Sequence, residues 1–177
     1  MSWDIQLDDP TGERISFVEK VINFTAPKIA RQPAPCVLTL PESFDMSLLR
    51  FDGWIEFRRT PIGGSKKFHN VYQIRAIGRQ DDANGRENIV VVGYDPLYIL
   101  TSRIIAYAAG SAQADMTDQA DDMLKAIVTD NLGGDAAGAR NVTANGISVA
   151  PDLALGPSIT KQFAYRPLQE EIGRAHV

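Results

Sequence analysis

The clearest structural pattern in the chain lies in VYQIRAIGRQDDANGRENIVVVGY, residues 71–94. Apolar and polar residues alternate through residues 71–78, and residues 88–94 are rich in β-branched side chains, as in two strands. Between them lies Asn84-Gly85, which is typical of a two-residue type I′ turn because both central residues of that turn need positive φ angles. The segment therefore predicts an antiparallel hairpin in which residues 71–79 pair with residues 87–93.

Strand-like patterns also precede this hairpin. Trp3, Ile5 and Leu7 alternate with polar residues, and a turn containing proline and glycine separates them from a second predicted strand over residues 15–24. Further strands are predicted over residues 36–40 and 53–58, and a polar, glycine-rich loop over residues 61–68. We therefore expect a β-rich, antiparallel, sheet-like or barrel-like unit over residues 1–95.

The hydrophobic period changes after this unit. Asp95-Pro96 is typical of a helix start, because aspartate caps the first turn and proline is tolerated there, and we expect this helix to end near Gly110. A second helix is predicted from about residue 118 to residue 132, with Gly133 at its end. Short strands are expected over residues 147–150 and 159–165. Residues 96–170 thus form a helical and mixed segment, and the fold class is α+β.

The last seven residues, 171–177, have the sequence Glu-Ile-Gly-Arg-Ala-His-Val. They resemble the translation of a common sequencing-adapter oligonucleotide. We therefore expect that these residues are not native, that Arg174 and His176 carry no functional information, and that the protein continues into a further part.

Composition and charge disfavour several classes of protein. The net charge is −4 and the sequence pI is about 5.2, which disfavours a dedicated nucleic-acid binder because phosphate binding needs a basic surface. No basic leader precedes an apolar segment, and no apolar run approaches the ~18 residues of a membrane span. We expect a cytoplasmically made protein without a membrane span.

The reactive side chains are few. Cys36 is the single cysteine, so no intrachain disulfide can form, and its strand-like surroundings predict burial. His69 is the one histidine outside residues 171–177, and no Ser/His/Asp set can be assembled around it. We therefore expect no enzyme activity in this part of the protein.

Three motifs resemble binding sites but lack the required spacing. Residues 61–67 lack the spacing of a phosphate-binding loop, and residues 81–85 lack the register of a calcium loop. Asp118, Asp121 and Asp122 suit the positive end of a helix, and no further metal ligand follows at helical spacing. We expect no catalytic, cofactor-binding or metal-binding residues, and no cofactor.

A basic cluster with interspersed aromatic residues lies around the glycine-rich loop. It comprises Arg50, Arg58, Arg59, Lys66 and Lys67, with Phe51, Trp54 and Phe57 between them. Such a cluster can contact nucleic acid, but alternation along a strand explains it more simply, so we predict a solvated strand face. Trp3, Trp54 and Tyr107 are candidate core or interface aromatics, and we favour the core for each.

The order of several short motifs resembles a known family. The motifs are Val37-Leu38-Thr39-Leu40-Pro41, residues 53–58, Val92-Gly93-Tyr94-Asp95, residues 97–100, residues 102–107, residues 120–125 and Asn131-Leu132-Gly133. Over about residues 3–168 the chain resembles siphovirus tail proteins of the ReqiPepy type, which are similar to baseplate-hub proteins at the tail tip. The resemblance rests on the order and spacing of the motifs, none of which is chemically diagnostic.

This resemblance implies a minor tail protein, a structural virion component that is assembled in the host cytoplasm. Its implied partners are other phage tail proteins and further copies of itself, without a cofactor and without nucleic acid. Two alternatives stay open at this point. In the first alternative, the chain is the N-terminal portion of a tail-associated hydrolase whose catalytic domain lies further along the protein. In the second, it is a module that binds a carbohydrate or a receptor.

Overall fold

The computed structural model describes residues 2–29, 32–105, 114–134, 136, 141–143, 148–151, 153–163 and 165–170. The chain divides into two compact units, Met1–Tyr98 and Ile99–Val177. The boundary expected from the sequence lies between residues 95 and 96. The expected boundary lies just before the first helix, α1 (Leu97–Thr101), and the observed boundary lies within it.

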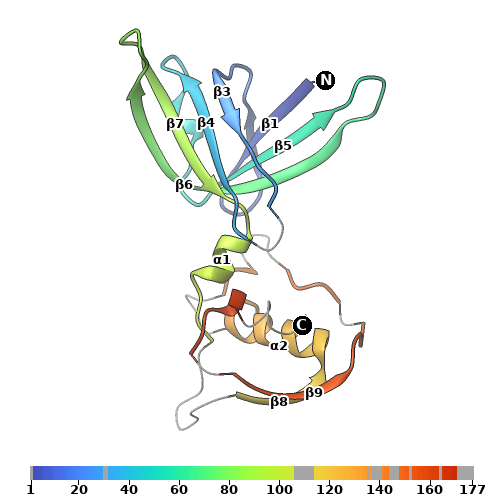
Figure 1. Cartoon of the computed structure of the whole chain (residues 1–177). Helices are drawn as coiled ribbons and strands as arrows, with labels where there is room; N and C mark the ends of the chain where they lie inside the picture. The colour runs from blue at the N-terminus through green and yellow to red at the C-terminus, as the bar shows by residue number, and fades with distance from the viewer. Residues whose placement is uncertain are drawn as a thin grey trace. The chain divides into compact units, whose positions relative to one another are not determined.

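The first unit is built on one seven-stranded sheet with the order β2-β1-β5-β6-β7-β4-β3. Its strands are β1 (Ser2–Asp8), β2 (Arg14–Phe17), β3 (Asn23–Thr25), β4 (Pro35–Pro41), β5 (Trp54–Thr60), β6 (Lys67–Asp81) and β7 (Glu87–Tyr94), with a 3-10 turn, η1 (Met46–Leu48), after β4. Neighbouring strands are antiparallel (Figure 1). The predicted α+β fold with a β-rich N-terminal part is confirmed.

The hairpin of β6 and β7 forms as predicted, but its turn differs. Gly85 has a φ of 73°, whereas Asn84 does not have a positive φ, so the type I′ prediction was wrong. The loop is instead one residue longer, because the N–H of Asp82 donates to the carbonyl of Arg86 at 2.8 Å. The carboxylate of Asp82 accepts from the N–H groups of Asn84 and Arg86 at 2.8 and 2.9 Å, which stabilises this wider loop.

Strand β6 pairs with two different neighbours along its length. Its first part pairs with β5 as far as Gln73, and its second part pairs with β7 from Gln73 onward. The register shifts between Ile74 and Ala76, where β6 changes neighbours. Gly93 lies opposite this point, and a Cβ there would come within 2.9 Å of the Gln73 carbonyl oxygen. The absence of a side chain therefore lets β7 approach the bend in β6.

The single strand predicted over residues 15–24 is in fact two strands on opposite edges of the sheet. The N–H of Val18 donates to Ile5 of β1, and the N–H of Ile22 donates to Thr39 of β4, both at 2.9 Å. Residues 18–22 therefore connect the outermost strands, β2 and β3. Because so short a connection joins them, the sheet must curl until its two edges come near each other.

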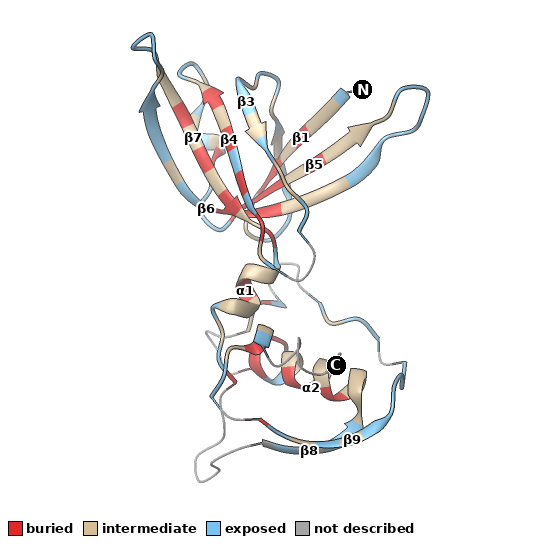
Figure 2. Cartoon of the chain, in the orientation of Figure 1, coloured by how far each residue is buried: buried red, intermediate tan, exposed pale blue. Residues whose placement is uncertain are grey.

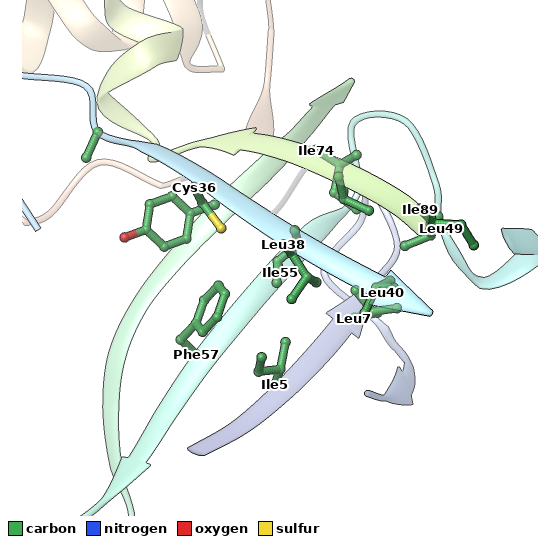
Figure 3. Packing of buried hydrophobic residues seen from close by; sticks show 13 residues of the cluster. Ile5, Leu7, Cys36, Leu38, Leu40, Leu49, Ile55, Phe57, Ile74 and Ile89 are labelled. Atoms are coloured by element: carbon green, nitrogen blue, oxygen red, sulfur yellow. The ribbon is translucent and has the colours of Figure 1, made fainter. Parts of the chain in front are cut away.

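The core lies on the inner face of this curled sheet. Most of its members come from β1, β4, β5, β6 and β7, and those with no exposed surface are Leu7, Ala34, Cys36, Leu38, Leu40, Ile55, Phe57, Tyr72 and Val91 (Figures 2 and 3). Burial of each large apolar side chain in this core stabilises the folded state by roughly 1.5–3 kcal/mol. The predicted burial of Cys36 and Trp54 is confirmed, and Trp3 is half-buried against the core. Tyr107 lies outside the described residues.

The second unit contains the helix α2 (Ala120–Leu132) and a two-stranded antiparallel sheet of β8 (Ala114–Gln119) and β9 (Ser158–Phe163). Asp118, predicted as helical, belongs to β8, because it pairs with Ile159 of β9. A Cβ on Gly133 would come within 2.7 Å of the Thr129 Cα. The φ of Gly133 is −87°, so the end of α2 does not need glycine for a positive φ. Glycine is instead required there because the backbone of α2 packs too closely for a side chain.

Helix α1 is shorter than predicted. It ends at Thr101, and the chain then pairs with the segment around Pro167, to which Ile104 forms an antiparallel bridge. The N–H of Ile105 donates to the Arg166 carbonyl at 3.0 Å, and the N–H of Leu168 donates to the Arg103 carbonyl at 2.8 Å. These hydrogen bonds replace the ones that a longer helix would make. The predicted end near Gly110 lies outside the described residues.

Two other predictions in this unit differ in outcome. The strand expected over residues 159–165 corresponds to β9. Of the strand expected over residues 147–150, residue 147 lies outside the described residues, and residues 148–150 are not in a strand.

The packing around Gly53 makes a testable prediction. A Cβ at this position would lie 2.6 Å from the Asp8 carbonyl oxygen and 3.0 Å from the Arg50 carbonyl oxygen. Gly53→Ala should therefore lower the free energy of unfolding by about 1–3 kcal/mol, measured by urea denaturation. Gly78→Ala is the matched control, because no atom lies within 4 Å of the position that its methyl group would take. Equal stability of the two variants would contradict the close approach of β1 and β5.

Candidate functional site

The two candidate nucleophile and base residues serve packing. The Nε2 atom of His69 lies 3.3 Å from the Ala26 carbonyl oxygen, and its ring meets the Trp3 ring edge-on at 5.0 Å. Cys36 is completely buried, and this burial raises the pKa of its thiol to about 12. A thiol that stays protonated is a poor nucleophile.

The candidate cation ligands also have structural partners. Asp118 accepts from the N–H of Gln119 at 2.8 Å, and Asp121 pairs with Lys125 one turn along α2 at 3.1 Å. Asp82 accepts two backbone N–H groups, and these hydrogen bonds lower the pKa of its carboxyl. Among the described residues, no group of three or more His, Cys, Asp or Glu side chains is placed to hold a metal ion.

The glycine-rich loop over residues 61–67 turns one strand into the next. The N–H of Gly64 donates to the Pro61 carbonyl at 3.1 Å, and Gly63 has a φ of 71°. The loop joins β5 to β6 and does not open a helix, so its N–H groups do not form the cradle that phosphate-binding loops provide.

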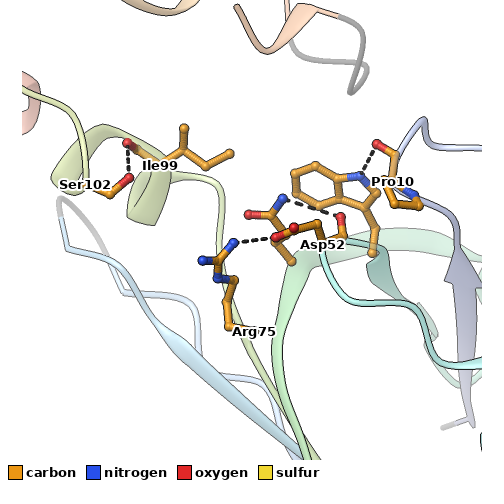
Figure 4. A network of polar contacts seen from close by, with 7 residues as sticks. Pro10, Asp52, Arg75, Ile99 and Ser102 are labelled. Atoms are coloured by element: carbon orange, nitrogen blue, oxygen red, sulfur yellow. Dashed lines mark hydrogen bonds and ion pairs between the residues drawn. The ribbon is translucent and has the colours of Figure 1, made fainter. Parts of the chain in front are cut away.

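A polar network holds the corner before β5. Arg75 forms an ion pair with Asp52, which has a positive φ of 63° (Figure 4). The side chain of Gln73 donates to the Asp52 carbonyl at 3.4 Å, and the Trp54 indole donates to the Pro10 carbonyl at 3.4 Å. These contacts fix the backbone, and we assign them a structural role.

A groove lies where the curled sheet remains open, between β2 and the end of β4. Its volume is about 310 Å³, and it is lined by Ser16, Phe17, Glu19, Lys20, Pro41, Ser43, Phe44, Asp45 and Leu48. Phe17 lies in the edge strand and is 47% exposed. The lining mixes four apolar residues, Phe17, Pro41, Phe44 and Leu48, with serine and charged side chains, and such a mixture is found on surfaces that contact another protein.

The basic cluster seen in the sequence does not form one continuous cationic surface, because two of its members are in ion pairs. Arg58 pairs with Glu56 at 2.6 Å, and Lys66 pairs with Asp4 at 2.8 Å.

The remaining strand cations of the cluster face each other. Arg59 of β5 lies directly opposite Lys67 of β6, and Trp3 of β1 lies opposite Arg59 on its other side. Within the described ranges, neither cation has an ion-pair partner. We call Trp3, Arg59 and Lys67 the cationic row.

Sequence reasoning missed both the groove and the cationic row as units. The groove brings Phe17 beside Phe44, and the row brings Trp3 beside Arg59. No local pattern marks either pair, because each depends on which strands become neighbours.

Comparison of the chain with models of known protein families and with curated proteins finds no match. No helix in the described part of the chain is long and apolar enough to cross a membrane.

The buried thiol makes a testable prediction. Because the folded chain holds the Cys36 proton up to a pKa of about 12, instead of the usual 9.0, the folded state is favoured by this group below about pH 9. That contribution is lost as the pH rises toward 12. A thiol reagent at pH 8 should therefore label Cys36 much more slowly in buffer than in urea, as followed by mass spectrometry. Equally fast labelling under both conditions would show that the site is open.

Proposed function

We propose that this chain is a structural subunit of a siphovirus tail tip, with a role in protein–protein assembly and without catalysis in this part. The proposal joins the order of sequence motifs, which resembles ReqiPepy-type tail proteins, to the surface of the first unit. The observation that carries it is the open groove beside β2, in which Phe17 is held at the surface. An aromatic side chain held in a groove at a sheet edge favours contact with another chain.

The edges of the sheet support association through side chains. Strand β2 has 4 residues and β3 has 3, and such short edges limit the open-ended strand pairing that leads to aggregates. Side-chain contacts in the groove are more selective, because they require a partner of matching shape. This combination suits a closed assembly of defined size.

Sedimentation velocity of the whole chain over a range of concentrations tests the assembly role. We expect an oligomer of defined size, and we expect Phe17→Asp to raise its dissociation constant about tenfold or more, because a carboxylate would be desolvated in the groove. Gln80→Asp, at an exposed position of β6, is the control and should associate like the wild type. A wild-type chain that stays monomeric, or a Phe17→Asp variant that associates normally, would contradict the proposal.

The virion assignment has a separate test. Sequencing the DNA that flanks the coding region should find tape-measure or other tail genes beside it. Metabolic genes in those positions would overturn the tail-tip assignment, whatever the oligomeric state of the chain.

A further inference from the structure

The cationic row places two like charges face to face. Arg59 and Lys67 are directly opposed across β5 and β6, an arrangement that destabilises a sheet unless an anion lies between the charges. Asp4, the nearest acid along β1, lies opposite Arg58 in the neighbouring row and pairs with Lys66 at 2.8 Å. The row is therefore a place where an acidic group from outside would relieve a repulsion built into the sheet.

The surroundings of the row favour a polypeptide over nucleic acid. The ring of Trp3 already has edge-on contacts with Phe24, Phe57 and His69, at centroid distances of 5.3, 6.5 and 5.0 Å, so it does not offer the open face on which a base stacks. The net charge of −4 also opposes a long polyanion.

The same hairpin carries exposed apolar side chains. Ile62 in its loop is 90% exposed, and Phe68 of β6 is 59% exposed. Phe68 lies opposite Arg58 and therefore on the other face of the sheet from Lys67. On the face of the row, the apolar neighbour of the two cations is Trp3, and this pairing is suited to a segment in which acidic and apolar side chains are mixed.

The chain itself contains such a segment. Residues 115–122, Asp-Met-Thr-Asp-Gln-Ala-Asp-Asp, hold four aspartates and no basic residue. Asp115 and Asp118 lie in β8, whereas the other two belong to α2, where Asp121 pairs with Lys125. Asp118 lies on β8 with its side chain exposed. Among the described strands, β8 pairs with β9 alone, so one of its two edges has no strand beside it. The negative charge of the two β8 aspartates is complementary to the positive charge of the row.

We infer that the cationic row of one copy binds the acidic β8 segment of a second copy of this chain. This inference rests on the proposed assembly function and names one of its interfaces. The row and the segment are different surfaces, so the contact is head-to-tail, and repetition of it produces a ring or a filament. Because its charges lie near the surface, the contact weakens as salt concentration rises.

Charge exchange tests the interface by sedimentation velocity. Arg59→Glu/Lys67→Glu and Asp115→Lys/Asp118→Lys should each weaken self-association about tenfold or more at low salt. An equimolar mixture of the two double variants should associate again, because both contacts then join opposite charges. Arg86→Glu, which changes an exposed cation in the loop between β6 and β7, is the control and should behave like the wild type. Failure of the mixture to associate would overturn the inference.

Variants with neutral side chains distinguish a lost contact from a folding defect caused by the charge reversals. Arg59→Thr/Lys67→Thr should raise the thermal midpoint of the isolated chain slightly, because it removes the opposed charges, and should still weaken association. If this variant and the charge-reversed row associate like the wild type while Phe17→Asp does not, the inference fails and the assembly function stands.

A peptide probe separates the inference from the assembly function. A labelled peptide of residues 114–122 should bind the wild-type chain and not Arg59→Glu/Lys67→Glu, as measured by fluorescence anisotropy. Binding of the peptide by a wild-type chain that self-associates supports the inference, whereas a wild-type chain that stays monomeric overturns it. If a single-stranded oligonucleotide binds the row and the peptide does not, nucleic acid replaces the second copy as the partner.

Discussion

The first unit depends on a single strand, β6, that pairs with two neighbours in succession. A straight strand would extend one flat sheet, whereas β6 passes from β5 to β7 at Gln73 and shifts register directly afterwards. A bulge of this kind increases the bend and the twist of a strand. Gly93 permits the bend, because a side chain there would collide with the backbone of β6.

The curl of the sheet follows from this bend and produces the groove. With β6 bent, β3 reaches the far side of the core, where Phe24 packs against Trp3 and Phe57 at the same centroid distance of 5.3 Å. The edges do not join by strand pairing, and the groove beside Phe17 lies where they stay apart. Core packing and the groove thus have one geometric origin.

Charge placement shows how far the candidate sites could be predicted from the sequence. The basic cluster was visible as a group, because its members lie near one another along the chain. Its division was not visible, since Lys66 pairs with Asp4, and Arg59 instead meets Lys67. A residue at the start of the chain decides which cation is neutralised, and that depends on β1 lying beside β5.

Local patterns in the chain were enough to predict the strands with clear alternation, the partners of the β6–β7 hairpin, the burial of Cys36 and the helix α2, because these depend on local periodicity and on neighbouring segments. Only the tertiary structure decided that residues 15–24 split between opposite edges of the sheet, that α1 stops at Thr101 and that Asp118 belongs to a strand. In each case a hydrogen-bond partner distant in the chain, such as Thr39, Pro167 or Ile159, overrides the local preference. Backbone N–H and C=O groups form hydrogen bonds with whichever partner the fold brings close, and the local sequence pattern does not identify that partner.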